Sequence, residues 1–182
     1  MESIKKVAII ILGNWNTKIF TPAWIMSELL ALNDNEEIKV GFNNNDLSPI
    51  YDYKDIKFIP TERAFEIRFE NVSNELLSIA NNALVKLLNT LPFTPNRLVG
   101  FNYSVDESLD ITGVSIPKYS GSFNLSEIKL TRNEVDYDLN IIIDCKNTQS
   151  IAYNFHYSDL SKITDTTIFE HVKYLKEQWA QI

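Results

Sequence analysis

The sequence predicts an α+β fold, in which a ferredoxin-like β-α-β-β-α-β half precedes an antiparallel β-meander and a C-terminal helix. Apolar residues alternate with polar ones in many short segments of the 182-residue chain, which is the period of half-buried strands, and three segments show the helical period instead. No linker divides the chain, so we expect a single domain over residues 1–182. It comprises a β-α-β-rich half (1–105), a surface excursion (106–122) and a meander with a terminal helix (123–182).

The clearest unit covers residues 56–105. Apolar residues alternate over Ala64–Phe69 and again over Val99–Val105, which predicts two strands. Between them, leucines recur at helical spacing over residues 76–91, and Ser73 stands where an N-cap residue accepts a hydrogen bond from the first turn. Asn81 falls among the polar residues opposite the leucines. A strand, a helix and a returning strand predict a β-α-β crossover.

The elements before this unit complete the ferredoxin-like half. The expected elements are a strand over Lys6–Leu12, a helix over Pro22–Leu32, a strand over Glu37–Phe42, and a hairpin that joins Asp55–Ile59 to Ala64–Phe69. Thr21 as a cap and Pro22 at the first helical position predict where the first helix begins. Tyr51 and Tyr53 either pack or anchor a partner.

After Val105 the pattern changes. Asp106–Ser122 contains Gly113, Pro117 and Gly121 and predicts a long surface segment, either a functional loop or a linker or short strand lying against the sheet. The meander strands are expected over Phe123–Leu130, Tyr137–Asp144 and Ser150–Tyr157. The last helix carries the apolar stripe Ile168, Val172, Leu175, Trp179 and Ile182, which we expect to dock onto the meander; the alternatives are a partner or a second copy of the chain.

Composition narrows the function classes. The net charge of -7 weighs against nucleic-acid binding, and the single cysteine, Cys145, excludes an intrachain disulfide and a cysteine-based zinc site. The apolar run Val7–Leu12 is shorter than a signal-peptide core or a membrane span, so we expect a cytoplasmic protein without a membrane segment. No phosphate-binding glycine motif is present, and we expect no cofactor. Abundant asparagine and isoleucine suggest an AT-rich bacterial or phage genome.

Two further interpretations of the sequence, base stacking and metal binding by histidine, each depend on a few residues. Arg63, Phe65 and Phe69 superficially resemble a base-stacking strand, but Phe65 shares its face with Ile67, as core residues do. His156 is expected on the polar face of its strand and His171 on the exposed side of the last helix. With no second ligand at suitable spacing, neither histidine predicts a metal site.

Asp144, Cys145 and Lys146 are the sharpest enzymatic candidate. They match half of the acidic-x-lysine motif of metal-dependent nucleases, where carboxylates hold a divalent cation and lysine helps to position water. A second carboxylate must lie nearby. Asp138 is six residues away along the same strand, and a hairpin turning near Asn133 is expected to place Glu127 opposite Asn140 instead. The alternative is a strand that ends in a polar turn.

Because no coherent active site emerges, the favoured function is non-enzymatic. We expect an interaction or adaptor protein of bacterial or phage origin that binds a protein partner or itself, through sheet edges, the 106–122 excursion or the terminal helix. The candidate contact residues are Trp15, Phe20, Trp179 and Ile182, although Trp15 and Phe20 could instead close the end of the core. The alternative function is the nuclease that uses Asp144 and Lys146. A small-ligand cleft between the two halves is also left open.

Overall fold

The computed structural model describes residues 4–44, 47–95, 98–106, 127–144 and 150–179. The strands are β1 (Ile4–Leu12), β2 (Lys39–Phe42), β3 (Pro49–Tyr53), β4 (Ile56–Pro60), β5 (Ala64–Glu70), β6 (Leu98–Asp106), β7 (Glu127–Asn133), β8 (Asp138–Asp144) and β9 (Ser150–Tyr157). The helices are α1 (Pro22–Trp24), which continues as a π-helix over Ile25–Leu29, α2 (Asn74–Thr90) and α3 (Thr167–Trp179), with 3₁₀ turns at Thr17–Ile19 and Leu160–Lys162.

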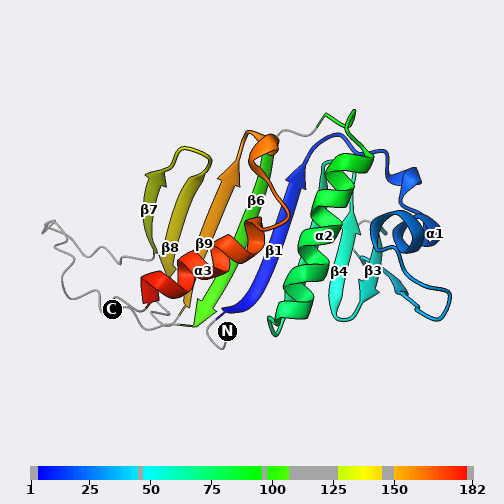
Figure 1. Ribbon diagram of the computed structural model, residues 1–182, viewed down its shortest axis with the longest axis horizontal. Helices are drawn as coiled ribbons and strands as arrows, with labels where there is room; N and C mark the ends of the chain where they lie inside the picture. Colours follow the sequence, from blue (N-terminus) through cyan, green and yellow to red (C-terminus); the bar gives the residue numbers. More distant parts are fainter. Residues whose placement is uncertain (1–3, 45–46, 96–97, 107–126, 145–149, 180–182) are drawn as a thin grey trace, which may run out of the picture.

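All nine strands form one antiparallel sheet in the order β2-β3-β4-β5-β1-β6-β9-β8-β7 (Figure 1). In the structure the sheet divides into two halves that differ from the expected ones, residues 4–90 (β1 to α2) and 98–179 (β6 to α3), and their first strands, β1 and β6, pair at the centre. Each half then builds outward from its last strand, β5 on one side and β9 on the other, and each of these is followed by a long helix. The α+β class is confirmed.

The ferredoxin-like order is wrong. That arrangement needs two strands between its helices, whereas four strands, β2 to β5, separate α1 from α2. Of these four strands, β3 is the one that was not predicted from the sequence; in it, buried Tyr51 and Tyr53 flank Asp52, which lies on the opposite face. The crossover through α2 does join parallel strands, because β5 and β6 both run antiparallel to β1, which lies between them.

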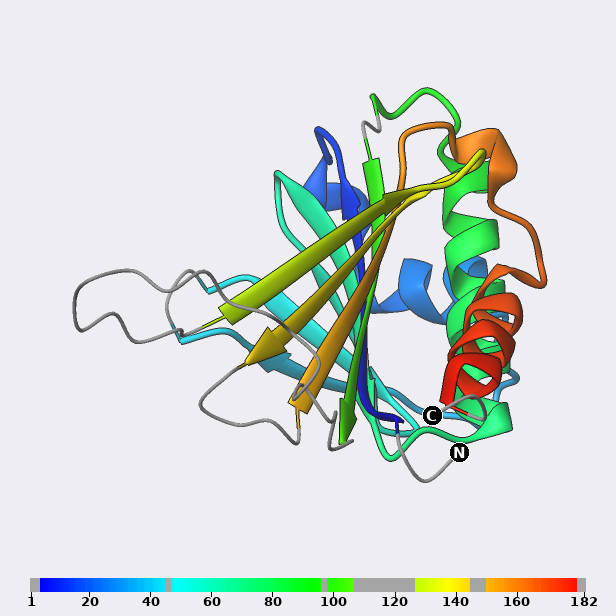
Figure 2. The same ribbon diagram turned by 90° about the vertical axis from the view of Figure 1, so that its left-hand side faces the viewer.

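The helices α2 and α3 cover one face of the sheet, and no described helix covers the other (Figure 2). Along β3, β4, β5 and β9, residues that point toward the helices are therefore buried, and those between them are more exposed to solvent. In β5, Phe65, Ile67 and Phe69 point toward the helices and are buried, whereas Glu66 and Arg68 lie on the other face. The predicted assignment of these aromatic residues to the core is confirmed.

The termini of the helices follow the predicted capping. Thr21 accepts a hydrogen bond from the Trp24 amide (3.2 Å), and Ser73 accepts one from the Leu76 amide (3.2 Å). The prediction for Asn81 was wrong, since this side chain is fully buried. Its amide donates to the Asp165 carbonyl (2.5 Å), and its oxygen accepts from the Ile168 amide (3.3 Å), so it ties α2 to the start of α3.

The terminal helix packs on β6 and on β9 of the meander. Ile168, Val172 and Leu175 are buried, as the apolar stripe predicts. His171 was expected to be exposed but is only 3% exposed, and its ring stacks on Phe155 with centroids 3.9 Å apart. No helix in the described ranges is long and apolar enough to span a membrane.

Candidate functional site

The two edges of the sheet differ in how open they are. Among the described residues, no strand pairs with the outer side of β2 or of β7. Unpaired main-chain groups at a sheet edge can pair with another chain, so proteins that stay monomeric usually protect their edges with charges, proline or bulges. Which groups the two edge strands present therefore indicates where another chain could bind.

The main-chain groups of Val40 and Phe42 face the open side of β2. Hydrogen-bonded and non-hydrogen-bonded pairs alternate along an antiparallel ladder. The Asn43 amide donates to the Ser48 carbonyl (2.9 Å), and this register makes Gly41 the next hydrogen-bonded residue. Val40 and Phe42 occupy the positions between, so their N–H and C=O groups point away from β3.

The same two residues carry exposed apolar side chains. Val40 is 45% exposed and Phe42 is 64% exposed. Both lie on the face that the helices cover elsewhere, because Val40 is opposite the buried Tyr51. Leu47, shortly after the strand, is 74% exposed. We call Val40, Phe42 and Leu47, with the outward main-chain groups of the first two, the β2 edge.

The opposite edge is protected. In β7 all residues except Ile128 are exposed, and charged side chains are spread along it at Glu127, Lys129 and Arg132. Leu130 is exposed as well, at 52%, but it lies between Lys129 and the polar Thr131. A partner strand would have to desolvate these charges, which hinders pairing at this edge.

The predicted contact residues are divided between the core and the chain end. Trp15 and Phe20 are buried at 5% and 2% exposure and pack on Phe65, with ring centroids 5.9 and 5.0 Å from it. Their packing matches the alternative in which they close the end of the core. The Trp179 side chain and Ile182 lie outside the described residues. A contact role for these four residues stays a prediction.

The register brings a second carboxylate to Asp144. Glu127 is directly opposite Asp144 on β7, and Asn140 faces Thr131, so the expected pairing of Glu127 with Asn140 was wrong. The strand β7 extends to Asn133, farther than the prediction, and this extension shifts the turn. Lys146 lies outside the described residues. Within the described part of the chain, no three acidic, histidine or cysteine side chains gather in a group that could hold a metal ion.

His171 offers no accessible acid or base. His171 is held between the Tyr103 hydroxyl at Nδ1 (3.0 Å) and the Tyr157 hydroxyl at Nε2 (2.7 Å), and burial lowers its pKa to about 3. A buried neutral imidazole cannot reach a substrate. His156 lies on the helix-free face as predicted, and burial, followed by the charge of Lys129, lowers its pKa.

Sequence patterns missed the β2 edge, because four residues with one glycine give no clear alternation. Phe42 could have indicated this site, but the sequence alone does not show whether a phenylalanine is exposed or belongs to the core. No protein-family model matches the chain, and no curated protein matches it in sequence. The functional argument therefore depends on the geometry of the chain itself.

Proposed function

We propose that this chain is a non-enzymatic interaction protein that binds another protein, or a second copy of itself, by strand addition at the β2 edge. The observation that carries the proposal is the coincidence of outward main-chain groups and exposed apolar side chains at Val40 and Phe42. In strand addition the main chain supplies hydrogen bonds and the alternate side chains supply contact area. Here both come from the same two residues.

The contrast between the two edges supports this location. A pairing strand would gain apolar contacts at β2, where Lys39 is the only charged residue of the strand, but would meet three charged residues at β7. Core packing does not explain the apolar residues of β2, since all four residues of this strand are exposed. Exposed apolar residues at an unpaired edge are typical of interaction sites.

The test compares Phe42→Lys with Leu130→Lys, which places the same charge on the opposite edge at a similarly exposed position. Sedimentation over a range of concentrations and capture from bacterial lysate are measured for both variants and the parent chain. We expect an association that Phe42→Lys removes and Leu130→Lys retains. Each variant should fold, because exposed substitutions change the free energy of unfolding by less than about 0.5 kcal/mol. Absence of association in the parent chain, or equal loss in both variants, would contradict the proposal.

The nuclease is a second candidate, supported by the pairing of Glu127 with Asp144. Mg²⁺ is commonly bound through one or two carboxylates, and Lys146 follows Asp144 by two residues in the sequence. The measurement is magnesium- or manganese-dependent cleavage of DNA and RNA. Asp144→Asn and Glu127→Gln should abolish cleavage, and Asp138→Asn, six residues away on the same strand, should not. Cleavage that survives Asp144→Asn excludes this candidate.

A further inference from the structure

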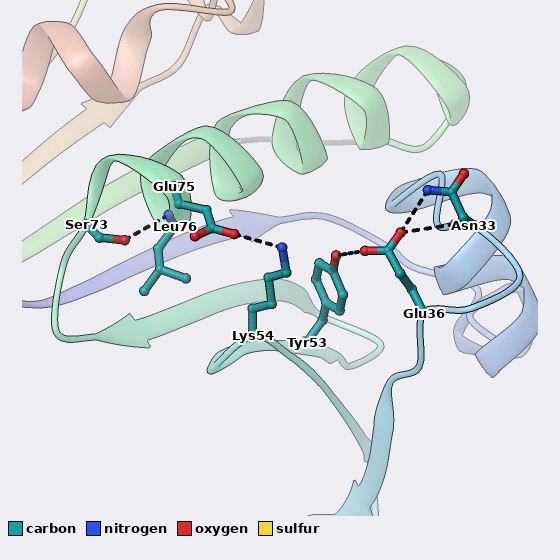
Figure 3. A network of polar contacts seen from close by, with 7 residues as sticks. All are labelled: Asn33, Glu36, Tyr53, Lys54, Ser73, Glu75 and Leu76. Carbon is teal, nitrogen blue, oxygen red and sulfur yellow. Dashed lines mark hydrogen bonds and ion pairs between the residues drawn. The ribbon is translucent and has the colours of Figure 1, made fainter.

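A pocket of about 350 Å³ lies between the loop after the π-helix, the β3–β4 turn and one face of α2. Its lining combines the apolar Leu29, Leu32 and Ile79 with the charged Glu36, Lys54 and Glu75. Ligand pockets in proteins commonly combine such a volume with an apolar wall and a few fixed polar groups. We call this cavity the Glu36 pocket; Figure 3 shows its charged residues.

One of the two carboxylates of the pocket is already neutralised. The Lys54 ammonium lies 2.7 Å from Glu75 Oε1, and this hydrogen bond raises the pKa of Lys54. Lys54 therefore remains a cation, which excludes it as a nucleophile. Together Lys54 and Glu75 contribute no net charge to the pocket.

Glu36 is the carboxylate of the pocket that has no ion-pair partner among the described residues. Its Oε1 accepts the Tyr53 hydroxyl (2.5 Å), and its Oε2 accepts the main-chain and side-chain amides of Asn33 (3.1 and 3.2 Å; Figure 3). All three donors are neutral, and the charge of Lys54, which pairs with Glu75, has only a minor effect on Glu36. The hydrogen bond from Tyr53, followed by that from the Asn33 main chain, lowers the pKa of Glu36. The carboxylate is thus ionised and fixed in orientation before anything binds.

A carboxylate offers about four acceptor positions, and three of those on Glu36 are occupied by these donors. The remaining position is open to a donor that enters the pocket. A cationic donor fits best, because it also compensates the charge, and the protein's net charge of -7 attracts cations to its surface. A carboxylate-bearing ligand would be repelled by Glu36.

Two residues that line the pocket have left-handed backbone conformations. They are Ala31 and Lys54, with φ of 52° and 49°. Lys54 and Asp55 (φ 66°) are the two residues between β3 and β4, and such two-residue hairpin turns require positive φ. Ala31 follows the π-helix that ends at Leu29, a form that often occurs at functional sites.

We propose that the Glu36 pocket binds a small organic ammonium ion, whose charged nitrogen donates to Glu36 and whose apolar body lies against Leu29, Leu32 and Ile79. The proposal does not depend on the β2 edge. It assigns Glu36 the role of charge recognition, and Tyr53 and Asn33 the role of positioning the carboxylate.

The probes are hexylammonium, hexanol and hexanoate, which share an apolar body and differ in charge. Titrations followed by amide NMR should show saturable shifts at α2 and the β3–β4 turn with hexylammonium, at a Kd of about 1 mM, as expected for so small a ligand. Hexanol should bind at least about tenfold more weakly, and hexanoate should not saturate. Since Glu36 is already ionised, hexylammonium binding should not change between about pH 6 and pH 8.

The matched variants are Glu36→Gln and Glu37→Gln, which remove neighbouring carboxylates while only the first lines the pocket. Glu36→Gln should weaken hexylammonium binding at least about tenfold, and Glu37→Gln should leave it unchanged. Tyr53→Phe, which keeps the charge but removes the positioning hydroxyl, should give an intermediate loss. Equal binding of hexylammonium and hexanoate, equal effects of the two glutamate variants, or no saturation in the parent chain would overturn the proposal.

Discussion

Acidification below about pH 6.5 should destabilise the fold through one buried side chain, His171. Its ring stacks on Phe155 at an interplanar angle of 15° and contacts Phe101 edge-on, with the Tyr103 and Tyr157 hydroxyls at its two nitrogens. A neutral imidazole has one donor and one acceptor, so one tyrosine donates and the other accepts. Protonation leaves both nitrogens as donors and places a charge in a site where no carboxylate of the described residues compensates it.

The magnitude follows from the pKa of His171 in the two states. Burial lowers it from 6.5 to about 3. Below pH 6.5 the unfolded chain binds a proton that the folded chain excludes until about pH 3, so stability is complete above 6.5 and falls as the pH decreases. At about 1.36 kcal/mol per unit, the loss is about 4 to 5 kcal/mol near pH 3 and about 2 kcal/mol near pH 5. Such a loss is a large part of the stability of an ordinary domain.

The assay is urea unfolding at several pH values between about 7.5 and 5, where few carboxylates titrate. The parent chain should lose about 2 kcal/mol over this interval, and His156→Gln should keep most of the loss, because His156 lies on the helix-free face. The His171 ring should remain neutral by NMR down to about pH 5, a measurement that needs no variant. A free energy of unfolding that is constant over the interval, or a pH dependence that disappears with His156→Gln, would refute the reasoning.

Three further substitutions test the packing. Ala31→Gly should raise the free energy of unfolding by about 1 kcal/mol, because glycine adopts a positive φ at lower cost than alanine. Ala23→Gly in α1 should lower the free energy of unfolding instead. A lower stability of Ala31→Gly would show that the positive φ of Ala31 costs no free energy. Asn81→Leu should lower the free energy of unfolding by about 1 to 3 kcal/mol, because the Asp165 carbonyl and the Ile168 amide lose their partner. The control is Asn82→Leu at an exposed position, which should change this free energy by less than about 0.5 kcal/mol. Similar urea midpoints for the two variants would refute the link between α2 and α3. Leu84→Asp should prevent folding, as judged by circular dichroism, because Leu84 is fully buried; a native spectrum would exclude Leu84 from the core.

The spacing of apolar residues predicted the strands and helices in which one face is buried and the other is exposed to solvent. The alternation in β5 and the leucine spacing of α2 identified the residues that pack, and Ser73 identified where α2 begins. Such patterns depend only on neighbours along the chain. They are reliable where burial is one-sided and carry no information on which strands are adjacent.

The features that sequence could not predict depend on contacts between distant segments. His171 looks like a polar residue outside an apolar stripe, and only the pairing of β6 with β9 places Tyr103 and Tyr157 at its two nitrogens. Glu36, in the loop before β2, similarly accepts a hydrogen bond from the distant Tyr53 on β3. The pairing of Glu127 with Asp144 depended on where one turn falls, and an error of a few residues there moves every opposite pair.

The position of β2 in the sheet connects the fold to the proposed interaction. If the halves are aligned outward from the central pair of β1 and β6, β5 corresponds to β9, β4 to β8 and β3 to β7, and β2 has no counterpart among the described strands. All four of its residues are exposed, so the core does not require it. The proposed function accounts for a strand that adds little to the core but presents Val40 and Phe42 at an open edge. It follows that Phe42→Lys should affect association far more than stability, a separation that a residue serving the core would not show.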